Sequence, residues 1–303
     1  MWAFYAAFAG ILWGIGNILD KYIMTKKITG FIMFIVMAQL INFFFGTFLL
    51  FNSNIDGLIN HLPQMAIVAL LDVVALSTYI FALRMDGASK VIPLFAMALI
   101  FIPLGDALFL GNVLTFDKYI GIALIMCFGF LLLLDPNKGL THSIKVFVVM
   151  FFSSLGYSSI WLLGETVVDE VGPIAFTGFM YFLRFLWIPI IAICVFLYGR
   201  QSFSKMYQSI KPSFKAGTLI PLIFSNGSGV FGIFLFVKAL EGAGIPSMVD
   251  AMSMSQYILV FLTPLILTKL WPRYFNEHIP KKILLQKLVC ITAMISGGLL
   301  ILF

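Results

Sequence analysis

The run from Met65 to Leu83, MAIVALLDVVALSTYIFAL, is long enough to cross a bilayer as one helix. It carries Asp72 near its middle. An unpaired charge in hydrocarbon costs several kcal/mol, so this carboxylate needs either a buried partner or a watery path. Both arrangements require a bundle of membrane helices, and the rest of the chain must supply it.

The composition places the whole chain in the membrane. Hydrophobic residues make up 61% of the 303 and charged residues 11%, whereas a soluble domain is about half apolar and a quarter charged. Soluble enzymes and nucleic-acid-binding proteins are therefore disfavoured. The three cysteines, Cys127, Cys194 and Cys290, lie in separate apolar runs, which predicts no disulfide framework, no metal cluster and no cofactor. The first apolar run begins at Met1 without a basic segment or cleavage site, so we expect a retained helix.

At about 20 residues per crossing, the sequence divides into ten apolar spans. The predicted spans are Ala3–Met24, Thr29–Phe51, Met65–Leu83, Val91–Leu110, Tyr119–Leu134, Ile144–Leu163, Pro173–Tyr198, Gly217–Val237, Ser247–Leu267 and Ile283–Phe303. Most connections are short, which predicts that sequential helices are antiparallel neighbours. Pro93, Pro103 and Pro264 are candidates for bends within their spans.

The ten spans form two sets of five, in residues 1–137 and 138–303. Because five is odd, the second set enters the membrane from the opposite side. Two inverted five-helix repeats are a ground plan of secondary transporters, which bind substrate between the halves near the midplane. A faint internal match supports the division, since Ala82-Leu83 and Gly87 align with Ala239-Leu240 and Gly244 at one constant offset.

Basic residues are distributed unequally between the two faces. Sixteen of the 19 Lys and Arg residues lie at the loops that follow the odd-numbered spans. The opposite face has Lys118 and Lys238, and Arg184 lies inside a span. The positive-inside rule then predicts a cytoplasmic basic face, with both termini outside. This asymmetry accounts for the net charge of +6 without a nucleic-acid partner.

Asp72 and Arg184 are the two formal charges near the bilayer centre, and pairing is the cheapest way to keep both charged. One interpretation is a central substrate or coupling site, in which Asp72 takes up a proton or cation. The other is a permanent structural ion pair. Further polar residues within the spans are expected to line the same cavity: Asn17, Tyr79, Asn226 and Gln256.

Other acids lie close to the predicted helix ends. Asp106 and Asp250 are candidates for a vestibule on one face, or are simply solvated. Asp20 and Lys21 are interpreted as an interfacial pair. The polar, glycine-rich stretch Ser225–Gly229 indicates either close helix packing or backbone exposed to a cavity.

The spacing of motifs argues against most catalytic classes. Gly105-Asp106 matches half of a G-x-G-D protease signature, but Pro103 replaces its first glycine. No H-E-x-x-H and no phosphate-binding G-K-[ST] loop is present. We predict that the protein is not an enzyme. An intramembrane aspartate-dependent enzyme, using Asp72 with Asp106 or Asp250, stays open as an alternative, as does a lipid scramblase or scaffold.

Several short motifs carry a resemblance to a known family. They are Ile11-Leu12-Trp13-Gly14, Leu110-Gly111-Asn112-Val113-Leu114-Thr115 with Gly121, Tyr181-Phe182-Leu183-Arg184-Phe185, and Gly297-Gly298-Leu299-Leu300. In this order, over nearly the whole chain, they resemble the drug/metabolite transporter superfamily in its EamA-like branch. The resemblance implies a cavity lined by helices 1 to 4 and 6 to 9, with helices 5 and 10 at the periphery.

The chain departs from that family at several points. Asn112 stands where the family usually has a glutamate, and the second span offers Gln39 and Asn42 in place of an arginine. Family members generally keep both termini in the cytoplasm, whereas the loop charge predicts both outside.

Together, these features predict an all-α polytopic membrane protein with ten transmembrane helices in two inverted five-helix repeats. We expect a secondary transporter of a small metabolite or amphipathic solute, working by alternating access, with protons or an exchanged solute as candidates for coupling. Its expected place is the plasma membrane, as a monomer or homodimer, with the bilayer and a small-molecule substrate as its partners.

Overall fold

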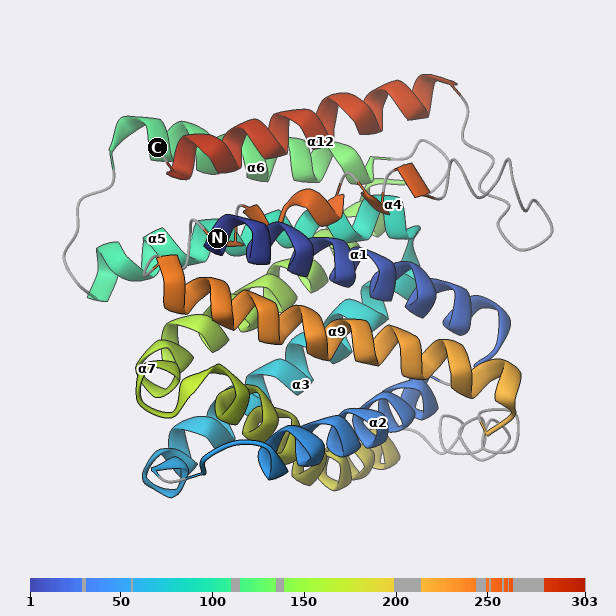
Figure 1. Ribbon diagram of the computed structural model, residues 1–303. Helices are drawn as coiled ribbons and strands as arrows, with labels where there is room; N and C mark the ends of the chain where they lie inside the picture. Colours follow the sequence, from blue (N-terminus) through green and yellow to red (C-terminus); the bar gives the residue numbers. More distant parts are fainter. Residues whose placement is uncertain are drawn as a thin grey trace.

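The fold was examined in a computed structural model (Figure 1). The structure describes residues 1–28, 31–55, 57–109, 115–134, 139–198, 214–243, 249–250, 252–257, 259–260, 262–263 and 281–302. Within these ranges every regular element is a helix and no strand occurs.

Eight helical segments are long and apolar enough to cross a membrane. Two of them, Leu140–Gly164 and Thr166–Ile190, lie within the bent helix α7. The segments belong to α1 (Trp2–Lys26), α2 (Phe31–Phe51), α3 (Leu62–Met85), α6 (Phe116–Leu133), α7 (Leu140–Tyr198), α9 (Ala216–Ala243) and α12 (Lys281–Leu302). The chain is therefore an all-α, multi-pass integral membrane protein, as the composition predicted.

The predicted sixth and seventh spans are the two arms of α7, and a single glycine separates them. Gly172 has φ +79°, a left-handed backbone conformation that glycine adopts without the steric cost of a Cβ. The first arm continues as helix beyond the predicted end at Leu163, and the backbone turns only at Gly172. The acidic segment from Glu165 to Glu170 is thus helical and not a loop.

The predicted fourth span is not one continuous helix. It is divided into α4 (Ala88–Val91), the 3₁₀ segment η2 (Ile92–Met97) and α5 (Ala98–Phe109). Pro93 lies in the first turn of η2 and has no N–H to donate to an α-helical ladder, which explains the tighter turn. A further short 3₁₀ segment, η1 (Leu58–His61), leads into α3.

The predicted ninth span, Ser247–Leu267, is described only in part, at residues 249–250, 252–257, 259–260 and 262–263. Short helical pieces are described between residues 249 and 263. Pro264 lies beyond them.

The closest packing joins helices from different halves of the chain rather than sequential helices. α1 packs on α9, α3 on the first arm of α7, α2 on α7, and α6 on α12 (Figure 1). The α1–α9 pair is antiparallel, because Gly242 approaches Trp2 while Gly16 approaches Ser225 and Ser228. Some sequential helices, such as α7 and α9, also contact each other, but the expectation that sequential helices are the main neighbours was wrong. Membrane helices pack where small residues let their backbones approach, and here those residues face across the halves.

Two of these pairs meet through glycine on both sides. A Cβ on Gly46 of α2 would lie 2.8 Å from the carbonyl oxygen of Gly178, and one on Gly178 would lie 3.1 Å from that of Gly46. A Cβ on Gly297 of α12 would likewise lie 2.8 Å from the carbonyl oxygen of Gly121 on α6. At both crossings the glycines therefore let the two backbones approach each other closely.

The antiparallel pairing places the basic helix ends together. The C-terminal ends of α1, α3 and α6 and the N-terminal ends of α7, α9 and α12 share one end of the bundle (Figure 1). The first and last helices begin and end at the opposite end, where N and C are marked. Lys26, Arg84, Lys145 and Lys215 lie at or near the shared end, which we call the basic end.

Candidate functional site

A cavity of about 160 Å³ lies between the two halves of the chain. Side chains from α1, α2, α3, η2, α5, both arms of α7 and α9 line it, together with Asp250, Gln256 and Tyr257. Its described lining contains no residue of α6 or α12, which pack together at one edge of the bundle (Figure 1). The structure brings all six residues predicted for the central site into this cavity: Asn17, Asp72, Tyr79, Arg184, Asn226 and Gln256.

The predicted ion pair between α3 and α7 is present. Arg184 Nη1 lies 2.7 Å from Asp72 Oδ2, and the two side chains are only 4% and 3% exposed. The contact has the distance of an ion pair without the alignment of a hydrogen bond, since Asp72 Oδ2 accepts none. Each of the two charges is therefore compensated by the other across the two halves of the chain, which offsets part of the cost of burying them.

Arg184 also has groups that Asp72 does not satisfy. Its guanidinium lies 4.7 Å from the centroid of the Tyr181 ring, a cation–π contact within α7. Its Nε–H has no acceptor among the described residues, although Arg184 is buried. One donor of the arginine thus stays unused.

A second chain of polar contacts crosses the cavity from α3 through α1 to Gln256 in the predicted ninth span. The Tyr79 hydroxyl donates to Asn17 Oδ1 at 2.8 Å, and Asn17 Nδ2 donates to Gln256 Oε1 at 3.5 Å. The fourth predicted lining residue, Asn226, donates to the Leu222 carbonyl of its own helix at 2.8 Å. Three of the four predicted lining residues therefore form one hydrogen-bonded chain.

Asp20 lines the cavity, which the sequence did not predict. It was interpreted as an interfacial pair with Lys21, but the two side chains point to different regions. Asp20 lines the cavity and accepts a hydrogen bond from the Ser225 hydroxyl, which also lies 3.1 Å from the Gly16 carbonyl oxygen. Lys21 points toward the end of α3. Adjacent residues on a helix do not face each other, so the expected pair was wrong.

The two acids predicted for a vestibule have different outcomes. Asp250 lines the central cavity itself, and the Ser253 hydroxyl lies 3.4 Å from its carboxylate. The side chain of Asp106 lies outside the described residues. For Ser225–Gly229, both predicted roles occur, because Ser225 and Gly229 line the cavity while Ser225 packs on Gly16.

Aromatic side chains form much of the remaining lining, and of these the sequence predicted only Tyr79 as a cavity residue. Phe95 packs between two tyrosines, with ring centroids 4.9 Å from Tyr79 and 5.3 Å from Tyr157. Trp13 and Trp161 both pack on Phe236 and border the cavity. In a chain with 33 phenylalanines, an aromatic residue at a cavity cannot be distinguished by type from one that faces lipid.

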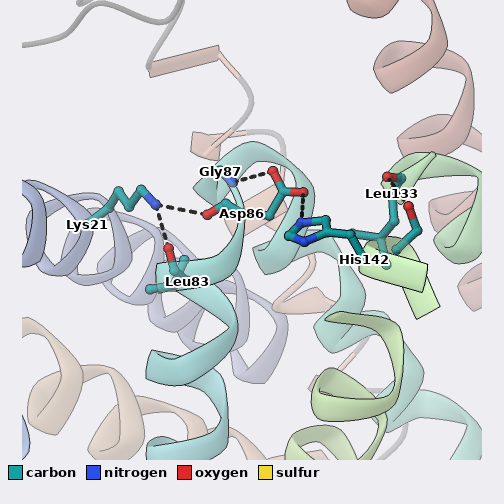
Figure 2. A network of polar contacts seen from close by, with 7 residues as sticks. Lys21, Leu83, Asp86, Gly87, Leu133 and His142 are labelled. Carbon is teal, nitrogen blue, oxygen red and sulfur yellow. Dashed lines mark hydrogen bonds and ion pairs between the residues drawn. The ribbon is translucent and has the colours of Figure 1, made fainter. Parts of the chain in front are cut away.

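A separate set of polar contacts lies at the basic end (Figure 2). Lys21 Nζ donates to the carbonyl oxygens of Leu83 and Asp86, at 2.5 and 2.8 Å. The Asp86 carboxylate accepts from the Gly87 N–H at 2.7 Å and lies 3.3 Å from His142 Nε2. These contacts join α1, the turn after α3 and the start of α7.

Two further buried residues add to this set. Lys287 of α12 donates to the Ser89 hydroxyl at 2.7 Å, and both residues are almost fully buried. We call these residues, Lys21, Asp86, Ser89, His142 and Lys287, the basic-end network.

Comparison with known proteins identifies a similar fold but no family. No family model matches the chain, and no curated protein sequence matches it. A solved structure described only as "Crystal structure of protein" is similar over 98% of this chain and 95% of that chain, with a TM-score of 0.55 and 14% identity. At that identity the similarity extends to the fold alone.

Proposed function

We propose that the protein is a secondary transporter that moves a small metabolite or amphipathic solute by alternating access between two five-helix halves. The observation that carries this proposal is the cavity between the halves, with the buried Asp72–Arg184 pair at its wall. A buried charge pair between two moving bodies is a contact that can differ between two states of a transporter. Protons or an exchanged solute are the candidates for coupling.

The pattern of helix pairing supports the inverted repeats. If the predicted spans are numbered one to ten, the pairs are 1 with 8, 3 with 6, 2 with 7, and 5 with 10. A twofold rotation that exchanges the halves puts span 1 in the place of span 6 and span 8 in the place of span 3, so the first pair becomes the second. The pair 2 with 7 and the pair 5 with 10 each become themselves, because their two members only change places. A helix that contacts its own counterpart must do so through the same positions on both sides. The contacts of Gly46 with Gly178 and of Gly121 with Gly297 fit that requirement.

The resemblance to the EamA-like family implies the same arrangement of helices around the cavity. On this ground we propose that the protein belongs to that family. Its expected peripheral helices, five and ten, correspond to α6 and α12, which contribute nothing to the described cavity lining. The ten-helix count, the plasma membrane as location, a small-molecule partner and a monomeric or homodimeric state belong to the same proposal.

Cysteine accessibility tests alternating access before any substrate is known. In a variant whose three native cysteines are replaced by alanine, Asn226→Cys places a thiol in the cavity. Phe224→Cys is the matched control, because Phe224 lies two residues away on the same helix and is 68% exposed on its outer surface. A charged, membrane-impermeant thiol reagent is added to right-side-out and to inside-out vesicles.

We expect the cavity thiol to react from both sides of the membrane and the control thiol to react from neither. Reaction of the cavity thiol from one side only would indicate a static vestibule, and reaction from neither side a closed core. Either result would overturn the proposal.

The alternatives predicted from the sequence have less support. Aspartate-pair catalysis needs two carboxyl groups that share a proton, whereas Asp72 contacts Arg184 and Asp250 contacts Ser253. A scramblase or scaffold would need a lipid-open groove in place of a cavity with polar and aromatic walls. Neither alternative is favoured by an observation of its own.

A further inference from the structure

The cavity contains more acidic than basic side chains. Among its described lining residues, Asp20, Asp72 and Asp250 are acidic and Arg184 is basic. Arg184 already faces Asp72 and the Tyr181 ring. Asp20 and Asp250 contact the hydroxyls of Ser225 and Ser253, which supply a hydrogen bond but no countercharge. Among the described residues neither of these two carboxyl groups has a countercharge, so a cation that entered the cavity would favour their charged form.

An independent feature of the cavity is an unused hydrogen-bond acceptor. Asn42 of α2 is 4% exposed and lines the cavity, and its side-chain oxygen has no donor among the described residues. A buried acceptor without a donor costs about 1–3 kcal/mol. A ligand that brings an N–H group into the cavity would remove this cost.

The rest of the lining fits an apolar body with a positive charge. Tyr79, Phe95 and Tyr157 form a continuous aromatic wall, and Leu76 and Ile233 add aliphatic surface. Aromatic faces attract cations and also pack well against hydrocarbon. An anion would meet this wall and two acids, and it would have to displace Asp72 from Arg184.

We propose that the cavity binds a small primary amine in its cationic form, with an apolar body. Asp20 and Asp250 supply the countercharge, and the Asn42 side-chain oxygen accepts one of the ammonium N–H groups. This assignment rests on the proposed function, because it names the chemical class of the solute that the transporter would carry.

Three probes with the same ring and different head groups test the charge. They are phenethylamine, 2-phenylethanol and 3-phenylpropionate, titrated into the purified full-length protein in a neutral detergent by calorimetry. We expect phenethylamine to bind and the alcohol and the carboxylate to bind at least about tenfold more weakly, equivalent to about 1.4 kcal/mol. Equal binding of all three, preference for the carboxylate or no binding of the amine would overturn the assignment.

Substitutions test which residues recognise the amine. Asp20→Asn and Asp250→Asn keep the side-chain shape and should each weaken phenethylamine binding at least about tenfold. Asp169→Asn is the matched control, because Asp169 is exposed and lies outside the cavity lining. Unchanged binding in both cavity variants, with thermal unfolding near that of the parent protein, would contradict the assigned countercharge.

The role of Asn42 has its own test. The trimethylated form of phenethylamine keeps the positive charge but has no N–H to donate. Asn42→Ala should weaken binding of the primary amine and leave binding of the trimethylated form nearly unchanged. An equal loss for both probes would show that Asn42 only shapes the cavity and would remove it from the assignment.

Flux measurements separate this inference from the proposed function. The three probes are loaded into proteoliposomes, and their release is compared with that from protein-free vesicles. Protein-dependent release of the alcohol or carboxylate without that of the amine would support a transporter and overturn the amine assignment. Binding of the amine without protein-dependent release would support the assignment and overturn transport.

Discussion

The central cavity and the basic-end network contain the same kinds of residue, yet they use them differently. At the basic end, Lys21 donates to the last carbonyls of α3, and Asp86 accepts from the backbone of Gly87. These charges satisfy backbone groups that a helix end leaves without partners. In the cavity, Asn42 Oδ1 and Arg184 Nε stay without partners among the described residues. The polar groups of the basic-end network thus complete the backbone of the fold, whereas some of the polar groups around the cavity remain available to a ligand.

The largest effect on stability is expected at the ion pair of the cavity. Arg184→Met leaves Asp72 buried without its cation, and breaking a buried pair by removing one partner costs about 3–5 kcal/mol. The double variant Asp72→Asn with Arg184→Met removes both charges and should regain most of that loss. Unfolding of the purified proteins in detergent measures both. A double variant no more stable than the single one would mean that the pair is not what holds the two halves.

An intermediate effect is expected at the basic end. Lys21→Met removes two charge-assisted hydrogen bonds to backbone carbonyls, which should lower the free energy of unfolding by about 1–2 kcal/mol. Lys26→Met makes the same charge change at an exposed position on the same helix and should have little effect. Binding of phenethylamine should be unchanged in both variants. Weaker phenethylamine binding in Lys21→Met would show that the basic-end network also contributes to ligand binding, and would contradict its separation from the cavity.

The smallest effect is expected at the partly exposed contact between His142 and Asp86. The two atoms lie 3.3 Å apart and the histidine side chain is 26% exposed, so solvent and salt screen the contact. His142→Phe should change the free energy of unfolding by less than about 1 kcal/mol, and the change should shrink at high salt. Unfolding at low and high salt tests both points, and a loss exceeding that of Lys21→Met would reverse the expected order.

The sequence predicted the features that depend on the cost of exposing charge or backbone to lipid. Membrane spans follow from length and hydropathy, and the Asp72–Arg184 pair follows because each charge needs a partner at that depth. The cavity position of Asn17, Tyr79, Asn226 and Gln256 was predicted by the same reasoning, since buried amides and hydroxyls also need partners.

What could not be predicted is which face of each helix meets which neighbour. In a soluble protein, polar residues mark the outer face of a helix, but lipid and protein interior are equally apolar. The cavity role of Asp20 and the pairing of α1 with α9 depend on such choices of face. The position of the turn at Gly172 also escaped prediction, because the acidic residues before it suggested a loop where the chain continues as helix.

The crossing of Gly46 with Gly178 has a consequence for motion. Because the backbones of α2 and α7 approach each other so closely there, this crossing is the point about which a tilt of α2 against α7 would turn. Asn42 lies four residues from Gly46 on α2, about 6 Å along the axis at 1.5 Å per residue. A tilt of about 10° about the crossing would therefore move Asn42 by about 1 Å, enough to make or break a hydrogen bond. A small rotation about this glycine crossing would thus change the hydrogen bonding in the cavity.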